Sequence, residues 1–200
     1  MSAMAVLPAF GRDAASPGDE LDELALARCR AGDRQAFRRF VLAYQRLVFA
    51  FLGRMLGPRA PVEDIAQDAF LRAYRSIASF DPSGPARLST WMLAIARHAA
   101  LDHLRKRSSE IATAEPSAID ARSPELEASR RQLGRRLSDA ASALPHDQRE
   151  AFLLHEVHGL SLEEIARVVG APLATVKTRC FRAREKLREE LSATRAEDDS

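Results

Sequence analysis

Residues 161–185, SLEEIARVVGAPLATVKTRCFRARE, predict two short helices separated by a tight break. Ser161 and Glu164 stand three positions apart, which is the spacing of a capping box and marks the start of the first helix. Gly170 supplies a residue that can adopt the left-handed conformation ending this helix, and Pro172 favours the first turn of the next one. The stretch therefore has the layout of a helix-turn-helix.

The two helices of this stretch have one apolar face and one basic face. Apolar residues recur at spacings of three and four, which predicts an inward face of Ile165, Ala166, Val169, Leu173, Val176 and Cys180. The second helix leaves an exposed face of Thr175, Lys177, Thr178, Arg179 and Arg182. Arginine and lysine can pair with guanine edges and phosphates, and threonine methyls can touch thymine. This face suits a DNA major groove, and a helical hairpin with a solvated basic face is the alternative.

The composition predicts a folded, helical chain. The 200 residues are 46% hydrophobic and 29% charged, which is ordinary for one large or two small globular domains. Aromatic residues make up 6%, while Ala, Leu, Arg and Glu dominate, so helices are favoured over a large sheet. The net charge is only +2, but acids gather in residues 1–24 and basic residues in 171–190. Such segregation indicates partners of opposite charge.

Several classes of protein are excluded by what the sequence lacks. Cys29 and Cys180 stand far apart, with neither a disulfide framework nor metal spacing, which fits a reducing cytoplasm, and Cys180 suits a small core position. Apolar runs are too short for a membrane helix, and the N-terminus lacks the pattern of a secretory signal. His98 and His103 stand five apart, off the spacing that shares a helix face. We therefore expect no metal site, no cofactor, no catalytic residues and no enzyme activity.

Composition shifts along the chain predict its organisation. Residues 1–19 read as a disordered leader, 20–107 as a first helical domain, and 108–131, rich in Ser, Ala, Pro and acids, as a flexible linker. Residues 132–193 form the helix-turn-helix domain, and 194–200 a polar tail. The predicted fold is all-α, with two small helical bundles joined by the linker.

Within the first domain, helix boundaries follow from caps and breakers. A helical pattern begins at Asp22, and residues from Phe37 to Leu52 recur at helical spacing on one buried face. Gly57 and Pro58 end this pattern, and Pro61 can start the next helix. Ser89 or Thr90 can cap a further helix that ends in a basic cluster.

Three stretches together resemble one family. VEDIAQDAFLRAYRSIASF (62–80), STWMLAIARHAALDHLRKR (89–107) and LPHDQREAFLLHEVHGLSLEEIARVVGAPLATVKTRCFRAREKL (144–187) are similar to regions 2.2, 2.3–2.4 and 4 of the bacterial ECF (extracytoplasmic function) sigma factors. These are compact initiation subunits of RNA polymerase. The resemblance covers about residues 22–107 and 133–192, and the ordered set of motifs is highly specific.

The resemblance implies a polymerase contact on the 62–80 helix. In the family this helix docks on the clamp coiled coil of the β′ subunit, which here falls on Asp64, Gln67, Asp68, Leu71 and Arg72. From the residues alone, acids grouped in the first turns suit a basic partner helix. They equally suit stabilisation of the helix dipole on a solvated face.

The resemblance also implies capture of the melted minus-10 promoter strand. The candidate residues are Arg87, Thr90, Trp91, Arg97, His98, Arg105, Lys106 and Arg107. Many members have Asn where this chain has His98, which leaves the preferred base open. Trp91 can stack on a base, or pack in the core as a Trp at a helix start commonly does.

Region 4 in the family reads the minus-35 duplex and touches the polymerase β flap. The matching residues are Pro172, Thr175, Lys177, Thr178, Arg179, Phe181 and Arg182. Phe181 can contact DNA or pack on the preceding helix.

The resulting hypothesis is a dissociable, cytoplasmic sigma factor that binds core RNA polymerase and the minus-10 and minus-35 elements of a promoter. We do not expect it to be inserted in a membrane. The family implies an anti-sigma factor as a further partner. A stand-alone helix-turn-helix regulator is the alternative function, and a helical adaptor that binds only protein is a third.

Overall fold

The computed structural model describes residues 21–57, 59–111, 140–141 and 143–198. The predicted leader and the predicted linker beyond Ile111 lie outside these residues. The described elements are α1 (Glu23–Arg30), α2 (Arg34–Leu56), α3 (Val62–Ser76), the 3-10 turn η1 (Ile77–Ser79), α4 (Leu88–Ile111), α6 (His146–Phe152), the π-helical η2 (Leu153–Val157), α7 (Leu162–Val169) and α8 (Leu173–Asp198). No strand occurs among them, which confirms the all-α prediction. None of these helices is long and apolar enough to cross a membrane.

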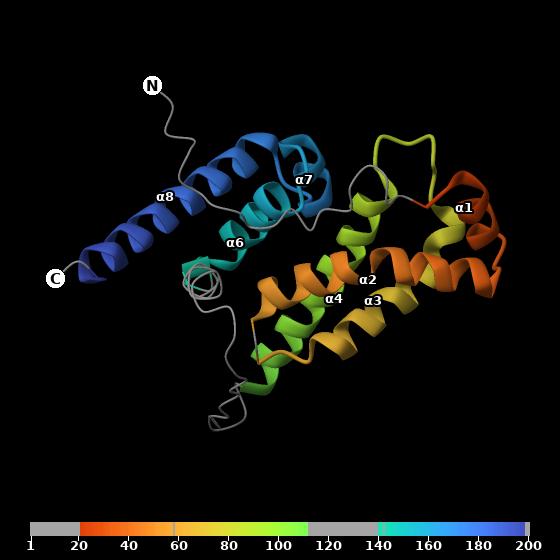
Figure 1. Ribbon diagram of the computed structural model, residues 1–200, viewed down its shortest axis with the longest axis horizontal. Helices are drawn as coiled ribbons and strands as arrows, with labels where there is room; N and C mark the ends of the chain where they lie inside the picture. The colour runs from red at the N-terminus through yellow and green to blue at the C-terminus, as the bar shows by residue number, and fades with distance from the viewer. Residues whose placement is uncertain (1–20, 58, 112–139, 142, 199–200) are drawn as a thin grey trace.

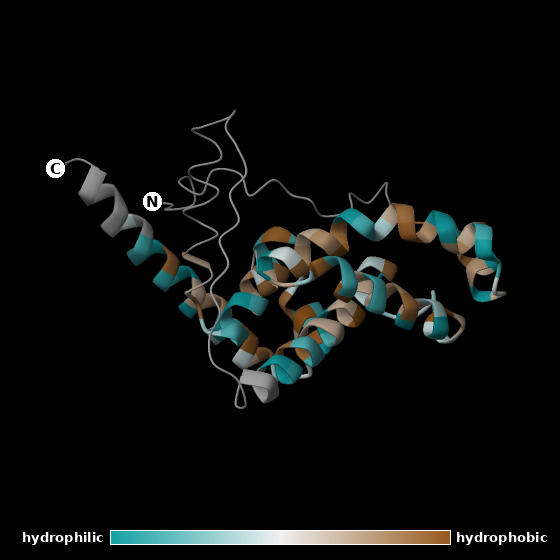
Figure 2. Ribbon diagram, turned by 90° about the horizontal axis from the view of Figure 1, so that it is seen from below, coloured by the Kyte–Doolittle hydropathy of each residue, from teal (hydrophilic) through white to brown (hydrophobic). Residues whose placement is uncertain are grey.

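Helices α1 to α4 form the N-terminal bundle, in which α2, α3 and α4 pack on one another (Figure 1). The predicted buried face of α2 is confirmed at Phe40, Tyr44, Val48 and Phe51, whose side chains are fully buried. Hydrophobic residues concentrate where the helices meet (Figure 2). Burial of this shared face is the main stabilising contribution to the bundle.

Local signals set the helix ends in this bundle. The Asp33 carboxylate accepts hydrogen bonds from the Gln35 and Ala36 amides at 2.8 and 3.2 Å, which starts α2. Gly32, with φ of 84°, separates α1 from α2. Gly57, with φ of 81°, follows the last residue of α2, and Pro61 precedes α3 as predicted.

The predicted start of the next helix is wrong. Helix α4 begins at Leu88, so Ser89 and Thr90 lie inside its first turn rather than capping it. Thr90 is buried, and its hydroxyl donates to the Glu164 carboxylate at 3.2 Å, so tertiary contact rather than capping determines its place. At its other end α4 continues to Ile111, past the predicted boundary at residue 107.

Helices α6, η2, α7 and α8 form the C-terminal bundle, in which α8 packs on α6 and α7. The capping box is confirmed, because Ser161 Oγ accepts from the Glu164 amide at 3.1 Å and Glu164 Oε2 accepts from the Ser161 amide at 2.9 Å. Gly170 has φ 66° and ψ 37°, the predicted left-handed cap.

The inward face of this helix-turn-helix is confirmed at its centre. Ile165, Val176 and Cys180 are buried. Leu173, Ala166 and Val169 are half-buried, whereas Val168, absent from the predicted face, is buried. The first helix is therefore rotated slightly from the expected stripe, which brings Val168 into the core.

The two bundles pack against each other. Helix α4 contacts α7, and α2 contacts both α6 and η2 (Figure 1). The Phe51 ring meets the His158 ring edge-on, with centroids 5.6 Å apart, and Arg149 donates to the carbonyl of Met55 at 3.0 Å. Buried side chains of both bundles thus join in one apolar cluster.

Candidate nucleic-acid interface

The predicted reading face lies on the outer side of α8. Lys177, Thr178 and Arg182 are exposed, while Thr175 and Arg179 are half-buried. Four of the predicted residues converge on one pocket between α8 and the start of α6, lined by Asp147, Gln148, Ala174, Thr175, Thr178, Arg179 and Arg182. The structure therefore brings threonine and arginine side chains together at a pocket that is open to a DNA base edge.

An acid from α6 belongs to this pocket, and sequence reasoning missed it. Asp147 Oδ2 lies 3.0 Å from Arg179 Nε. Asp147 stands in the first turn of its helix, where an acid is also explained by the helix dipole. No local signal marks it as a partner of Arg179, because the two residues belong to different helices.

The remaining minus-35 candidates lie beside the pocket. Phe181 is 62% exposed, so its ring does not pack on the preceding helix. Pro172 is exposed just before α8. Thr178 is exposed, and its Oγ1 donates to the Ala174 carbonyl at 3.0 Å, so its hydroxyl proton is already used within α8.

Trp91 packs against the core of the N-terminal bundle. Its ring centroid lies 5.4 Å from that of Phe80 and 6.5 Å from that of Phe40. It is half-buried and packs against the buried cluster. The structure shows this packing contact, and stacking of Trp91 on a base stays a prediction.

The minus-10 candidates nearest the start of α4 face the C-terminal bundle. We call Arg87, which directly precedes α4, and Thr90 and Arg97 of α4 the α4 polar face. Arg97 Nε donates to Glu150 Oε1 at 2.5 Å, and Arg87 Nε lies 3.5 Å from Glu164 Oε1. Thr90 donates to the same Glu164 oxygen. All three side chains are therefore engaged by carboxylates of α6 and α7.

Glu164 carries charge in this setting. Burial alone would raise the pKa of Glu164. Hydrogen bonds from Ser161, the Arg87 charge and the Thr90 hydroxyl outweigh burial, so the pKa lies below its usual value. The carboxylate that contacts the α4 polar face is thus held in its ionised form.

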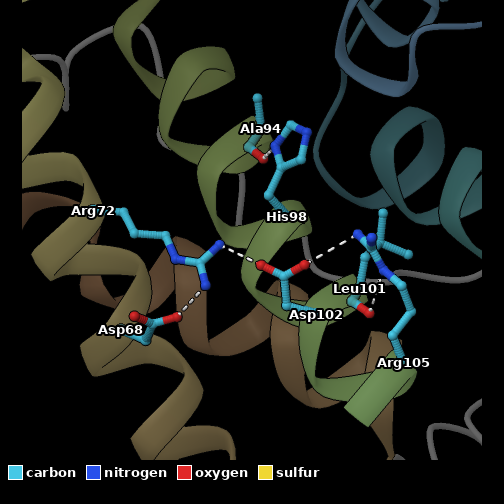
Figure 3. A network of polar contacts seen from close by, with 7 residues as sticks. All are labelled: Asp68, Arg72, Ala94, His98, Leu101, Asp102 and Arg105. Atoms are coloured by element: carbon cyan, nitrogen blue, oxygen red, sulfur yellow. Dashed lines mark hydrogen bonds and ion pairs between the residues drawn. The ribbon is translucent and has the colours of Figure 1, made fainter. Parts of the chain in front are cut away.

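The other minus-10 candidates lie further along α4 and are exposed. Figure 3 shows two of them, His98 and Arg105. The His98 Nδ1 atom lies 2.7 Å from the Ala94 carbonyl, and Arg105 pairs with Asp102 at 3.0 Å. Lys106 is exposed one residue beyond. These side chains form a basic end of α4 outside the contact between the bundles.

The polymerase-docking candidates on α3 divide into two groups. Asp64, Gln67 and Leu71 are exposed. Arg72 instead pairs with Asp68 at 2.7 Å and with Asp102 of α4 at 2.6 Å, so it ties the two helices together (Figure 3). The hydrogen bond from Arg72 holds the pKa of Asp102 below its usual value.

The described residues offer little for metal or thiol chemistry. No group of three or more metal-ligating side chains occurs in the part of the chain that the structure describes. Cys29 and Cys180 are both buried, and burial raises the pKa of each thiol, which disfavours the reactive thiolate. Cys180 therefore fills a core position, as its spacing predicted.

Two family descriptions match the chain in order. Residues 40–110 match sigma-70 region 2, and residues 134–187 match sigma-70 region 4. The sigma-H factor of RNA polymerase from Pseudomonas aeruginosa is 33% identical over 180 residues, which cover 84% of this chain and 92% of that protein. The ECF RNA polymerase sigma-E factor of Haemophilus influenzae is 35% identical over 178 residues, covering 83% and 93%.

A solved structure agrees with these relatives. The sigma factor RpoE from Bartonella quintana, in complex with the anti-sigma factor NepR, aligns with a TM-score of 0.63 at 28% identity. The alignment covers 78% of this chain and 96% of that chain. With relatives 33–35% identical along nearly their whole length, and both sigma-70 regions present in order, the chain belongs to the ECF family of RNA polymerase sigma factors, which direct promoter-specific transcription initiation.

Proposed function

We propose that this sigma factor docks on core RNA polymerase through the exposed face of α3 and contacts promoter DNA with two separate helices. In this proposal α8 reads the minus-35 duplex, and α4 holds the melted minus-10 strand. The observation that supports it is the exposed cationic face of α8 around the Asp147–Arg179 pocket, on the bundle that matches sigma-70 region 4.

The α8 face has separate groups for positioning and for reading. Lys177 and Arg182 are exposed, so their charges can bind phosphates and fix the position of the helix on the duplex. Arg179, held by Asp147, has a defined direction and suits a guanine edge. Thr175 and Thr178 supply methyl groups for thymine contacts at the same pocket.

The α3 face suits a protein partner. Asp64 and Gln67 flank an apolar contact at Leu71, which is 47% exposed. An acid and an amide beside an exposed leucine complement a helix that carries basic and apolar side chains, as expected for the β′ clamp coiled coil. The β flap is the expected second contact, made by the C-terminal bundle.

The α4 side chains suit a single strand. His98, Arg105 and Lys106 form the exposed basic end, and the α4 polar face adds two arginines and a hydroxyl. Cationic groups along one helix can track a phosphate backbone, and a hydroxyl can bond a base edge. Trp91 contributes by packing the start of α4 onto the bundle rather than by stacking on DNA.

Two weak readers on one chain reinforce each other. Once one bundle is bound, the second meets its DNA site at a high effective concentration, so neither needs high affinity alone. The protein then needs no catalytic chemistry of its own and acts where the polymerase is, in the cytoplasm. An anti-sigma factor is the expected regulator, since the sigma factor RpoE is solved in complex with one.

Reconstitution with core polymerase tests this function. Purified protein is added to core polymerase and fragmented genomic DNA, and the 5′ ends of the transcripts are sequenced. We expect a shared pair of elements upstream of the start sites. Failure to bind core polymerase, or transcripts without common upstream elements, would refute the proposal.

Charge reversal separates a DNA reader from an adaptor that binds only protein. The triple change of Lys177, Arg179 and Arg182 to Glu should abolish transcription from these promoters, because Arg179 and Arg182 line the pocket and Lys177 is exposed on the same helix. The matched control is Arg188→Glu, on the same helix outside the pocket, which should retain most activity. An adaptor would tolerate the triple change. A stand-alone regulator would instead bind its operator tightly without polymerase in a gel shift.

A further inference from the structure

Helix α2 has an exposed outer face that carries two large apolar side chains. Leu42 and Phe49 are 56% and 40% exposed, and they stand seven positions apart, which places both on the same side of the helix. The opposite side of α2 is buried in the core, for example at Phe40 and Tyr44. The exposed apolar pair is therefore separate from the residues that hold the bundle together.

Arginines surround this apolar pair. Arg38 precedes Leu42 by four positions, and Arg46 stands between Leu42 and Phe49, at spacings that bring side chains together on a helix. Arg34 lies one turn before Arg38. All three arginines are exposed, and none forms an ion pair with another residue that the structure describes. We call Arg34, Arg38, Leu42, Arg46 and Phe49 the α2 outer stripe.

The charges of α2 differ from those of an ordinary solvated helix. Solvated helices commonly carry acids and bases at spacings of three and four, and these side chains pair and stabilise the helix. Helix α2 contains five arginines and no acidic residue in its 23 residues. Arg34 and Arg38 place like charges one turn apart, which destabilises a helix slightly. Acidic groups of a bound partner would remove this repulsion.

The composition of the α2 outer stripe fits a protein helix better than DNA. Phenylalanine and arginine are enriched at protein interfaces, whereas DNA-binding surfaces are more polar. Seven residues of helix span about 10 Å, so Leu42 and Phe49 match two apolar side chains two turns apart on a partner helix. Acidic side chains one turn from these would reach Arg38 and Arg46. The matching partner is an acidic amphipathic helix.

The α2 outer stripe is opposite in charge to the exposed face of α3. That face presents Asp64, Gln67 and Leu71, and it suits a partner helix with basic side chains. The arginines of the α2 outer stripe would repel the same basic helix. The N-terminal bundle therefore has two exposed faces that suit two different helices.

We propose that the α2 outer stripe is a docking site for an acidic amphipathic helix of a protein partner. Leu42 and Phe49 bury the apolar side of that helix, and the three arginines pair with its carboxylates. The site is separate from the surfaces assigned above to polymerase and DNA, so this inference does not depend on the proposed function.

The first test measures binding of a fluorescein-labelled synthetic peptide to the full-length protein by anisotropy. The peptide is a helix of about 18 residues, with leucines seven positions apart and glutamates one turn from each leucine. A second peptide has the same composition in scrambled order, so its charge is identical. We expect the ordered peptide to bind at least about tenfold more tightly than the scrambled one. Equal affinities would overturn the proposal.

Variants of the apolar pair test whether the peptide uses it. L42A/F49A should bind the ordered peptide at least about tenfold more weakly than the wild type. The matched control is Leu24→Ala, which removes a leucine of α1 that is 72% exposed and should leave the affinity unchanged. Circular dichroism verifies folding, and if the double variant does not fold, Phe49→Ala alone is compared with Leu24→Ala. Equal affinity of the wild type and the stripe variant would rule out the site.

Variants of the arginines separate a protein site from a phosphate site. R38Q/R46Q should weaken binding of the ordered peptide, whereas R75Q/R167Q, which removes two exposed arginines from α3 and α7, should not. Equal losses in the two variants would show general charge attraction and refute docking on α2. Binding of a duplex of mixed sequence is measured in parallel. If R38Q/R46Q weakened only duplex binding, the stripe would be a phosphate site and the proposal would be wrong.

Photo-crosslinking locates the bound peptide. Gln45 is half-buried and stands three positions after Leu42 and four before Phe49. A p-benzoylphenylalanine in place of Gln45 should crosslink to the ordered peptide. The same group in place of Gln67 on α3 should not, because that face is acidic. Crosslinking from Gln67 alone, or from neither position, would contradict the proposed site.

Discussion

Asp147 Oδ2 lies 3.0 Å from Arg179 Nε, so an acid at the start of α6 holds an arginine of the proposed reading helix. The Arg179 side chain is 27% exposed and that of Asp147 48%, which leaves the guanidinium accessible from the pocket. An arginine held in one direction loses less conformational entropy when it bonds a base. Asp147 therefore orients the Arg179 side chain before DNA binds.

Asp147→Asn should reduce sequence discrimination more than affinity. Loss of the acid frees Arg179 and removes a charge that repels phosphates. The affinity for non-specific DNA should therefore stay the same or increase. Discrimination at the contacted base pair should fall by about 1 kcal/mol or more. The measurement is anisotropy with the minus-35 duplex found by reconstitution and with a scrambled duplex. Glu163→Gln is the control, and an unchanged ratio of the two affinities would contradict the prediction.

Ser161→Ala should destabilise the helix-turn-helix. Its hydroxyl oxygen accepts from the Glu164 amide at 3.1 Å, and loss of such a cap costs about 1 kcal/mol. Urea unfolding followed by circular dichroism measures the change. Ser192→Ala is the matched control, since that exposed hydroxyl donates only to the Arg188 carbonyl within α8. Equal midpoints for the two variants would show that the capping box adds nothing.

Stability should fall on mild acidification because of His146. Burial lowers the pKa of His146 from its ordinary value of 6.5, and its Nε2 has no hydrogen-bond partner among the described residues. Glu150 and Asp147 nearby raise the pKa, while Arg149 and Arg97 lower it, and burial prevails. Below pH 6.5 the unfolded chain takes up a proton that the folded chain resists, so folding is progressively disfavoured.

The contribution of neutral His146 to the free energy of unfolding is thus fully present above the pKa of this residue in the unfolded chain. It is lost as the pH falls toward the pKa of this residue in the folded chain. The slope from this one group is at most about 1.4 kcal/mol per pH unit. Urea unfolding at pH 7.5 and at pH 5.5 should show a larger loss for the wild type than for His146→Gln. Parallel losses in the two proteins would assign the acid sensitivity to other groups.

Trp91 should report folding and not DNA binding. It is the one tryptophan of the chain, and its ring contacts Phe80 and Phe40 in the N-terminal bundle. Its fluorescence should shift to longer wavelength when the bundle unfolds in urea. A saturating DNA single strand should leave the intensity nearly unchanged in the holoenzyme, after subtraction of the core polymerase signal. Strong quenching would instead indicate stacking on a base.

Much of the fold could be predicted from the sequence because its signals are local. The Ser161–Glu164 box, the left-handed Gly170 and the breaker at Gly57 each act within one helical turn, and all three lie where expected. The prediction that Thr90 caps α4 was wrong because its contact is not local. Its hydroxyl has a partner 74 residues away, and that contact outweighs the local preference for a cap.

The sequence by itself determined the helices, the helix-turn-helix and the types of side chain on α3, α4 and α8. Only the tertiary structure decided which of these side chains are paired. Arg97 with Glu150, Arg87 with Glu164 and Arg179 with Asp147 all join different helices. Helical periodicity specifies which face a residue occupies, but not which other face it meets. That choice depends on how the two bundles pack, and their packing brings Glu150 and Glu164 to the α4 polar face.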